Sequence, residues 1–501
     1  MQANRREFIK QASALTLGVS ALSLSLTPTQ LMAGDEPLAQ QLPLTSKNAH
    51  LLNRISFGIN QQSMRRINRI GYRRYIEEQL NPDALDDVEL EAYIDEHLPT
   101  VNQSIAQTRL QVRTREISRL RAADELAMAT YLRAIYSKKQ LLQIMVEFWN
   151  NHFSVYHLDG PVVFLKTQED KEVMRPLALS SFSQLLHASA KSPAMIYYLD
   201  GYASSKEAPN ENYARELMEL HTLGVDGPYT HHDIDEVARC FTGWKINQRN
   251  GKFRFSRKDH DGDEKLVLGH TISSGGGVTD GEHVVEILAA HESTATFMAT
   301  KLCRHFIADE PSPAIIESTA ERFLDSQGDI KACLRHILLS NEFINSQDKK
   351  LKRPFHYMTA VARSLAVTFT GRGAVRSTRQ MFDSLGQRPF FWQSPDGYPD
   401  VASFWESTTG MLFRWNYAND VCFRDFAGYQ YDLSNLVSKP YTPENIYQQI
   451  TEKIIYRQMN ESDQRLMLDY LYDGTKNGRV SPLKIQGALA LAMGSPYFQL
   501  N

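Results

Sequence analysis

PNENYARELMELHTLG, at residues 209–224, has the pattern that decides the fold class. Pro209 favours the start of a helix and Gly224 its end, because proline suits the first turn and glycine the position after the last turn. Between them, Tyr213 and Leu217 recur at the helical period on one side. The same period dominates the chain from Ser46 onward, and alternating strand patterns are few. We therefore predict a mainly α-helical protein.

The polar side of this predicted helix carries several ionisable groups. With Glu216 at zero on a helical wheel, Asn212 lies at about 40°, Glu219 at about 60° and Arg215 at about 100°, all to one side. We identify Glu216, Glu219 and Asn212 as candidate catalytic residues, with a glutamate as general base or ligand. The alternative is a solvated face with an Arg–Glu pair.

Two histidines are candidate metal ligands at an interior site. His221 falls on the apolar side of the same predicted helix. His152 falls on the apolar side of a second helix, predicted from KKQLLQIMVEFWNNHFSV at 138–155. A hydrogen-bonded core histidine is the commoner outcome for either residue alone. Two of them in strongly patterned helices predict a shared site.

A third group of candidates lies in an acidic loop. The runs FRFS and KLVLG alternate as strands do, and we predict that they form one small β-hairpin at about 251–271. The loop between them holds Asp259, His260 and Asp261, which we identify as candidate ligands of a divalent metal ion. A solvated acidic turn is the alternative.

The amino-terminal residues resemble an export signal. Arg5 and Arg6 precede a short apolar run that is rich in Ser, Thr and Gly, as in the twin-arginine signals that direct folded proteins out of the cytoplasm. We predict a signal peptide over 1–33 and a linker over 34–44. The expected location is the periplasm or another exported compartment.

Charge and cysteine usage exclude some classes of function. The 501-residue chain has a formal net charge of −3 and no basic stripe, so nucleic acid is not an expected partner. After the signal, no segment is long and apolar enough to cross a membrane. The four cysteines, Cys240, Cys303, Cys333 and Cys422, form no CxxC pair, and we expect buried thiols.

The segment GQRPFFWQSPDGYPDVASFW, at 386–405, is too rich in proline, glycine and aromatic residues to form one regular element. Trp392, Trp405 and Trp415 lie in it or just after it. Their rings either pack in the core or stack on sugars and cover a cleft.

Many of these residues lie in segments that resemble the bacterial domain of unknown function family 1800. The similar segments are HLLNRISFG (50–58), VEFWNNHFSV (146–155), SPAMIYYLD (192–200), PNENYARELMELHTLGVDGPYT (209–230), EVARCFTGW (236–244), the HD-then-LGH region (260–270), TATFMATKLCRHF (294–306) and GQRPFFWQSPDGYP (386–399). The resemblance implies one helical domain over 45–501 and export. It also implies, as a candidate partner, an exported protein resembling alkaline phosphatases and sulfatases that is encoded nearby. It implies no activity.

Three functions remain open at this point, and whether the chain is an enzyme is one of the questions. The first is an exported enzyme or metal-binding protein with an interior Glu/His/Asn site and a divalent metal ion as candidate cofactor. The second is a non-catalytic accessory of the phosphatase- or sulfatase-like protein. The third, weaker alternative is carbohydrate processing, which the acidic pairs and clustered aromatic residues suggest.

Overall fold

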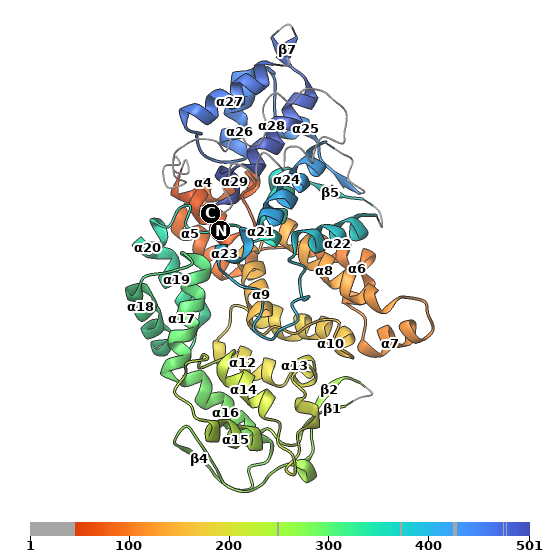
Figure 1. Ribbon diagram of the computed structural model, residues 1–501, viewed down its shortest axis with the longest axis vertical. Coiled ribbons are helices and arrows are strands. Elements are labelled where there is room, and N and C mark those ends of the chain that lie inside the picture. The colour runs from red at the N-terminus through yellow and green to blue at the C-terminus, as the bar shows by residue number, and fades with distance from the viewer. Residues whose placement is uncertain (1–45, 248–249, 371–372, 424–427, 474, 477) are drawn as a thin grey trace. The chain divides into compact units, whose positions relative to one another are not determined.

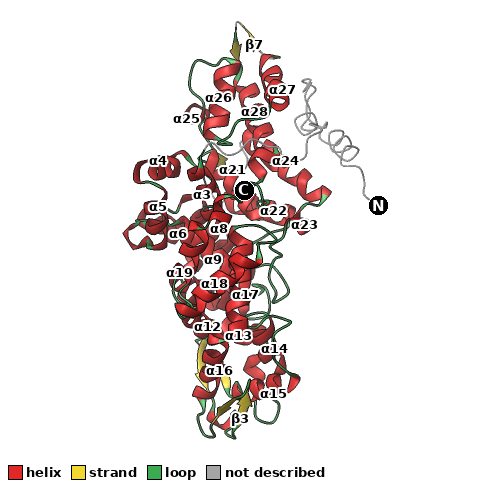
Figure 2. Cartoon of the chain, turned by 90° about the vertical axis from the view of Figure 1, so that its left-hand side faces the viewer, coloured by secondary structure: helices red, strands yellow, loops and turns green. Residues whose placement is uncertain are grey.

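The computed structural model describes residues 46–247, 250–370, 373–423, 428–473, 475–476 and 478–501. The predicted signal peptide and linker lie outside the described residues. Helices dominate those residues, and every sheet among them has two strands, which confirms the mainly α prediction (Figure 2). None of the helices in this described part has the length and hydropathy that crossing a membrane requires.

The chain forms two units, and the second one receives a short segment from late in the sequence. Unit 1 holds the described residues of 1–75, 343–388 and 400–501. Unit 2 holds residues 76–342 and 389–399. The chain therefore enters unit 2 twice.

Unit 1 is built from helices and two small sheets. In chain order they are α3 (Lys47–Ile55), α4 (Gln61–Ile70), α21 (Pro354–Ser364), β5 (Thr368–Phe369), α22 (Gly373–Leu385), α23 (Ala402–Trp405), α24 (Thr408–Phe423), β6 (Tyr429–Gln430), α25 (Leu433–Leu436), α26 (Pro443–Lys453), α27 (Glu461–Tyr472), β7 (Thr475–Lys476), β8 (Arg479–Val480), α28 (Pro482–Gly494) and α29 (Pro496–Gln499). α28 packs against α24, and small residues such as Ala488 and Ala492 are fully buried along it. The chain passes from unit 1 to unit 2 within helix α5 (Tyr72–Leu80), and it returns to unit 1 within helix α20 (Asn341–Ile344).

Unit 2 contains all of the predicted site residues, and its elements are labelled in Figure 1. Its longer elements are α6 (Val88–His97), α7 (Ile105–Arg113), α8 (Arg119–Tyr136), α9 (Gln140–His152), α10 (Val162–Glu169), the π-helix η4 (Asp170–Met174), α12 (Phe182–Ala190), α13 (Pro193–Tyr198), α14 (Glu211–Glu219), α15 (His231–Cys240), α16 (Val278–Ala290), α17 (Glu292–Phe306), α18 (Pro313–Asp325) and α19 (Ile330–Leu339). Short helical turns are η2 (Pro82–Ala84), η3 (Pro99–Val101), α11 (Arg175–Leu177), η5 (Gly201–Ala203) and η6 (Arg257–Asp259).

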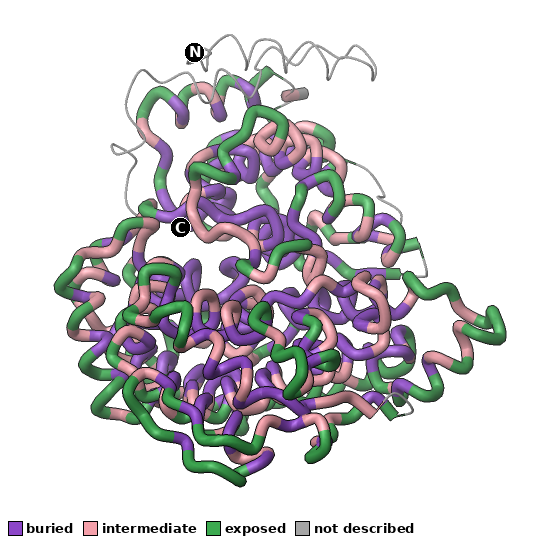
Figure 3. The backbone as a smooth tube through the Cα atoms, turned by 60° about the horizontal axis from the view of Figure 1, so that its bottom comes forward, coloured by how far each residue is buried: buried purple, intermediate pink, exposed green. Residues whose placement is uncertain are grey.

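Helix α9 supplies much of the core of unit 2. Trp149 and Phe153 are fully buried, and the Trp149 indole N–H donates a hydrogen bond to the Ala178 carbonyl at 2.9 Å. The indole N–H is the one polar group of this large buried ring. Its hydrogen bond compensates for the water that the N–H loses on burial. In Figure 3 the buried residues run along the inner faces of the helices, as amphipathic patterning requires.

The strands of unit 2 pair differently from the prediction. β1 (Trp244–Asn247) pairs with β2 (Lys252–Phe255), and β3 (Lys265–Val267) pairs with β4 (His270–Ile272), both antiparallel. The runs FRFS and KLVLG therefore belong to two separate hairpins and do not pair with each other. Each run pairs with its near neighbour because a short turn loses less conformational entropy than a long acidic loop.

The cysteine prediction is confirmed. All four cysteines are free and buried. Burial raises the pKa of the Cys303 thiol to about 11 and that of the Cys422 thiol to about 12. These thiols are therefore inert packing groups rather than nucleophiles.

Candidate functional site

Helix α14 begins at Glu211, two residues after Pro209, where the sequence predicts its start, and it ends earlier than predicted. The Asn210 side chain accepts a hydrogen bond from the Tyr213 N–H at 3.0 Å, so it caps the first turn. The helix ends at Glu219, with Leu220 as its C-cap. His221 therefore lies in the turn after the helix, and its placement on a helical face was wrong.

Part of the polar side of α14 is an intrahelical ion-pair ladder. Arg215 lies 3.7 Å from the Glu211 carboxylate and 3.6 Å from that of Glu219. All three side chains are partly exposed, and Asn212 is exposed. Pairs of this kind contribute a few tenths of a kcal/mol. Glu219 and Asn212 thus lie on the solvated side of the helix.

Glu216 differs from its neighbours on the same helix. It is half-buried, and its carboxylate forms no hydrogen bond or ion pair with any residue that the structure describes. Burial, followed by the charges of Glu219 and Asp396, raises the pKa of Glu216, and Arg215 only partly opposes this. A half-buried, unpaired carboxyl among other carboxyls is typical of a functional position.

Asp396 comes from the late segment of unit 2, residues 389–399, which is fixed on the end of α9. The Asn151 side chain donates to the Tyr398 carbonyl at 2.9 Å and accepts from the Tyr398 N–H at 2.7 Å. Gly397 has a φ of +78°, and a Cβ there would lie 2.1 Å from the Asn151 carbonyl oxygen. The two-way hydrogen bond and the close approach define the position of the segment.

Trp392 is the tryptophan that this segment presents near Glu216. Its indole N–H donates to Asp396 at 2.8 Å, and its ring packs on Tyr398 with centroids 4.9 Å apart. By contrast, Trp405 is buried and Trp415 donates to a main-chain carbonyl in unit 1. Trp392 is half-exposed, and its hydrogen bond to Asp396 places its ring beside that carboxyl.

Tyr198, at the end of α13, connects the parts of this site. Its hydroxyl donates to the Gln393 carbonyl at 2.7 Å. Burial raises the pKa of Tyr198, and the charges of Asp159, Asp396 and Glu216 raise it further. The phenol is therefore the common electrostatic neighbour of three carboxyls from different segments.

Asp159 is a second carboxyl held in its protonated form more tightly than usual. Burial and the charge of Asp200 raise its pKa, against the opposing effect of Arg119. Asp200 and Phe390 have φ values of 58° and 67°, which is rare for a bulky residue such as Phe390. Such conformations cluster at functional positions. We call Asp159, Tyr198, Glu216, Trp392 and Asp396 the Glu216 site.

Sequence reasoning identified Glu216 as a candidate catalytic residue and Trp392 as a ring that either packs in the core or stacks on sugars, but it did not identify Asp159, Tyr198 or Asp396. Tyr198 and Asp396 lie in segments that carry the family resemblance, SPAMIYYLD and GQRPFFWQSPDGYP. The family resemblance therefore marked both segments, but a single sequence does not show that they lie side by side in the fold.

The structure brings His152 and His221 together in an aromatic interior. The His152 Nε2 lies 3.1 Å from the His221 carbonyl, which can only accept, so this nitrogen carries a proton. The ring centroids are 5.9 Å apart, and the rings of Phe153 and Phe182 lie beside them. Burial, and then the charge of Lys301, lowers both pKa values, that of His221 to about 3.

Both imidazoles are therefore neutral at neutral pH, which is the form that binds metals. His152 Nδ1 and His221 Nε2 have no hydrogen-bond partner among the described residues. The same part of the chain offers no third His, Cys or carboxylate ligand close to both.

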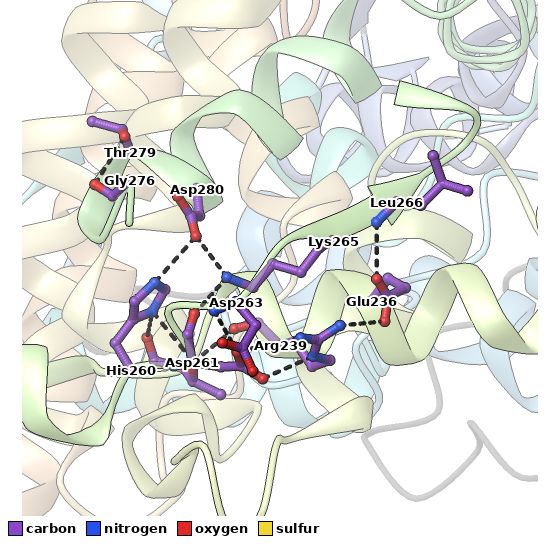
Figure 4. A network of polar contacts seen from close by, with 11 residues as sticks. Glu236, Arg239, His260, Asp261, Asp263, Lys265, Leu266, Gly276, Thr279 and Asp280 are labelled. Atoms are coloured by element: carbon purple, nitrogen blue, oxygen red, sulfur yellow. Dashed lines mark hydrogen bonds and ion pairs between the residues drawn. The ribbon is translucent and has the colours of Figure 1, made fainter. Parts of the chain in front are cut away.

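His260 has different neighbours and belongs to a buried polar network (Figure 4). Its Nδ1 donates to the Thr242 carbonyl at 2.8 Å, and its Nε2 lies 3.2 Å from Asp280. The Lys265 ammonium lies 2.7 Å from the same Asp280 oxygen, and both side chains are fully buried. The network joins the loop to β3 and α16.

The acidic residues of the loop also have donors from the protein. Asp261 accepts from the Arg239 Nε at 2.7 Å, and Arg239 also pairs with Glu236 at 2.7 Å. Asp259 accepts from the Ser256 hydroxyl at 2.7 Å. The loop oxygens thus act as hydrogen-bond acceptors that fix the loop on α15.

A metal-capable group that sequence reasoning missed lies on the surface of α14 and α15. Glu211, His231 and Asp235 place one ligand atom each within 4.8 Å of one another. His231 and Asp235 are four residues apart on α15, so they share a face. Glu211 and His231 are exposed, and Arg215 already lies 3.7 Å from Glu211.

Comparison with known proteins gives a family and no activity. No curated protein and no solved structure matches the chain. One family model matches residues 50–500, which is nearly all of the described chain. The chain belongs to the family described as Protein of unknown function (DUF1800).

Proposed function

We propose that the chain is an exported enzyme that transfers a proton in a hydrolytic reaction at the Glu216 site. The observation that carries this proposal is the Glu216 carboxyl itself, which is half-buried, has no described partner and has a raised pKa. A general acid needs a carboxyl that keeps its proton near the working pH. Burial and like charges are the means by which proteins achieve this.

The neighbouring groups supply what such chemistry also needs. Asp396 and Asp159 come from two other segments, and either provides a second carboxyl with a different environment. Two carboxyls in different environments can divide the roles of acid and base. Tyr198 offers a phenol beside all three.

Replacing Glu216 with glutamine tests the site without knowledge of the substrate. The folded protein binds the Glu216 proton more tightly than the unfolded chain does, because the pKa is raised on folding. Ionisation therefore costs stability as the pH rises through the unfolded and then the folded pKa. We expect Glu216→Gln to raise the melting temperature at pH 7 and to leave it unchanged at about pH 3.5, below the ordinary glutamate pKa.

Glu211→Gln is the matched control for this experiment, since Glu211 is exposed on the same helix and paired with Arg215. We expect no gain in stability from it at either pH. A Glu216→Gln variant that melts below the wild type at pH 7 would contradict the proposed state of this carboxyl.

Export is tested by the arginine pair of the amino-terminal signal. We expect the change of Arg5 and Arg6 to lysine to leave the precursor in the cytoplasm, because the twin-arginine route recognises that pair. Fractionation of cells followed by immunoblotting measures this. Unchanged export of the variant would indicate the general secretory route.

The accessory role beside a phosphatase- or sulfatase-like protein stays a prediction from the family resemblance. Copurification from cells that express both proteins at natural levels tests it.

A further inference from the structure

We propose that the substrate of the Glu216 site is a neutral glycan whose sugar rings stack on Trp392 and on the Tyr197–Tyr202 pair. This inference rests on the proposed function, because it names the substrate class of the same site. Its support comes from aromatic and charged side chains that the acid–base argument does not use.

The first aromatic surface is Trp392 with Tyr398. The indole is half-exposed, and its N–H is held by Asp396 at 2.8 Å. The Tyr398 ring packs on it at 4.9 Å, and Asn151 fixes the Tyr398 backbone. The indole plane is therefore set before any ligand binds, which lowers the entropy lost on binding.

The second aromatic surface is the pair Tyr197 and Tyr202. Their rings are parallel within 6°, with centroids 4.9 Å apart, and Tyr202 is 36% exposed. The charges of Asp159 and Asp200 act on Tyr197, so these carboxyls lie next to the pair. This surface therefore combines ring faces with hydrogen-bond acceptors.

Tyr198 links the two surfaces. It follows Tyr197 in the chain, and its hydroxyl donates to the Gln393 carbonyl, next to Trp392. The phenol beside Glu216 is thus next in the chain to the tyrosine pair and hydrogen-bonded to the residue that follows Trp392. A chain of sugar rings can stack on several aromatic rings and donate hydrogen bonds to the acceptors that lie near them.

The charge of the site selects among ligands. Even while Glu216 holds its proton, Asp159, Asp200 and Asp396 outnumber the nearby Arg119 and Arg215, so the local field disfavours phosphate and sulfate esters. A pyranose ring presents C–H groups to the electron-rich face of an aromatic ring and donates hydroxyl protons to carboxylates. A neutral glycan can therefore use both the aromatic rings and the carboxylates of the site.

The reaction follows from these roles. Glu216 gives its proton to the glycosidic oxygen, and the bond from that oxygen to the anomeric carbon breaks. Water adds its oxygen to the anomeric carbon and gives its proton to the second carboxylate, Asp396 or Asp159. Proton transfer from that group to Glu216 through solvent restores the starting state.

Isothermal titration of the mature protein with cellohexaose, xylohexaose, laminarihexaose and mannohexaose tests the inference. We expect at least one of these hexasaccharides to bind, and we expect Trp392→Ala and Tyr202→Ala each to weaken that binding at least about tenfold. Tyr472→Ala is the control, because Tyr472 is an exposed aromatic residue of unit 1, and it should bind like the wild type. Polygalacturonate, an anionic glycan, should not bind.

The outcomes separate this inference from the proposed function. If no hexasaccharide binds, or if Trp392→Ala and Tyr202→Ala bind like the wild type, the glycan inference is overturned, and the pH experiment on Glu216 still decides the acid–base role. A hexasaccharide can also bind through Trp392 without depending on Glu216 for cleavage. If the wild type and Glu216→Gln then cleave it equally, or if neither cleaves it, the glycan inference stands and the acid–base role of Glu216 is overturned. If the wild type cleaves the hexasaccharide and Glu216→Gln binds it without cleaving it, the glycan inference and the acid–base role are both supported.

Discussion

Replacing Asp280 with alanine is expected to destabilise unit 2 by about 3–5 kcal/mol. One Asp280 oxygen accepts from the Lys265 ammonium at 2.7 Å and faces His260 at 3.2 Å. The Lys265 and Asp280 side chains are fully buried. The substitution leaves the lysine charge in the interior without its counter-ion, and the remaining hydrogen bond to the Asp261 carbonyl offsets only part of the cost of desolvating that charge. Urea denaturation followed by circular dichroism measures the loss.

A double variant separates the lost ion pair from lost packing. Asp280→Ala combined with Lys265→Met removes both charges and keeps most of the lysine volume, so we expect it to recover much of the stability. Asp235→Ala is a control at a more exposed position of α15. A double variant as unstable as the single one would show that Asp280 stabilises the fold through something other than Lys265.

Gly397→Ala is the second substitution with a large expected effect, and it acts on the Glu216 site. The new Cβ would lie 2.1 Å from the Asn151 carbonyl oxygen, and the φ of +78° is unfavourable for any L residue with a side chain. We expect the 389–399 segment to leave its position on α9. A loss of about 3 kcal/mol or more in stability, or a red shift of the protein's tryptophan emission at nearly unchanged stability, is the expected result.

Gly386→Ala is a matched control for the backbone conformation. Gly386 has the same φ of +78°, and a Cβ there would meet nothing within 4 Å. Its substitution should therefore cost only the conformational strain of about 1–2 kcal/mol. Equal effects of the two substitutions would show that contact with Asn151 does not hold the segment.

Local signals in the sequence explain where α14 and α15 begin. Asn210 caps α14 beside Pro209, and Thr230 and Asp233 form a capping box at the start of α15. These features depend on residues three or four positions apart, so one sequence contains the information needed to read them. The end of α14 was harder to predict: after Glu219 the His221 N–H bonds to the Glu216 carbonyl at 3.2 Å, so the α-helical hydrogen-bond pattern stops before Gly224.

Contacts between distant segments could not be predicted in this way. Asn151 and Tyr398 are far apart in the chain, and their two hydrogen bonds bring Trp392 and Asp396 toward Glu216. The strand pairing failed for a related reason, since periodicity identifies a strand and does not identify its partner. The sequence therefore indicated Glu216 and the neighbouring Glu219, but it did not indicate that Asp396 also acts on the Glu216 pKa.

The double entry of the chain into unit 2 has a consequence for biosynthesis. Residues 76–342 leave the ribosome before residues 389–399 have been made, and domains fold as their segments emerge. A nascent chain that stops before residue 389 thus carries Glu216 and Tyr198 but lacks Trp392 and Asp396. The site is divided between a large early fragment and a short late one, as in split proteins whose activity returns only when the second piece is added.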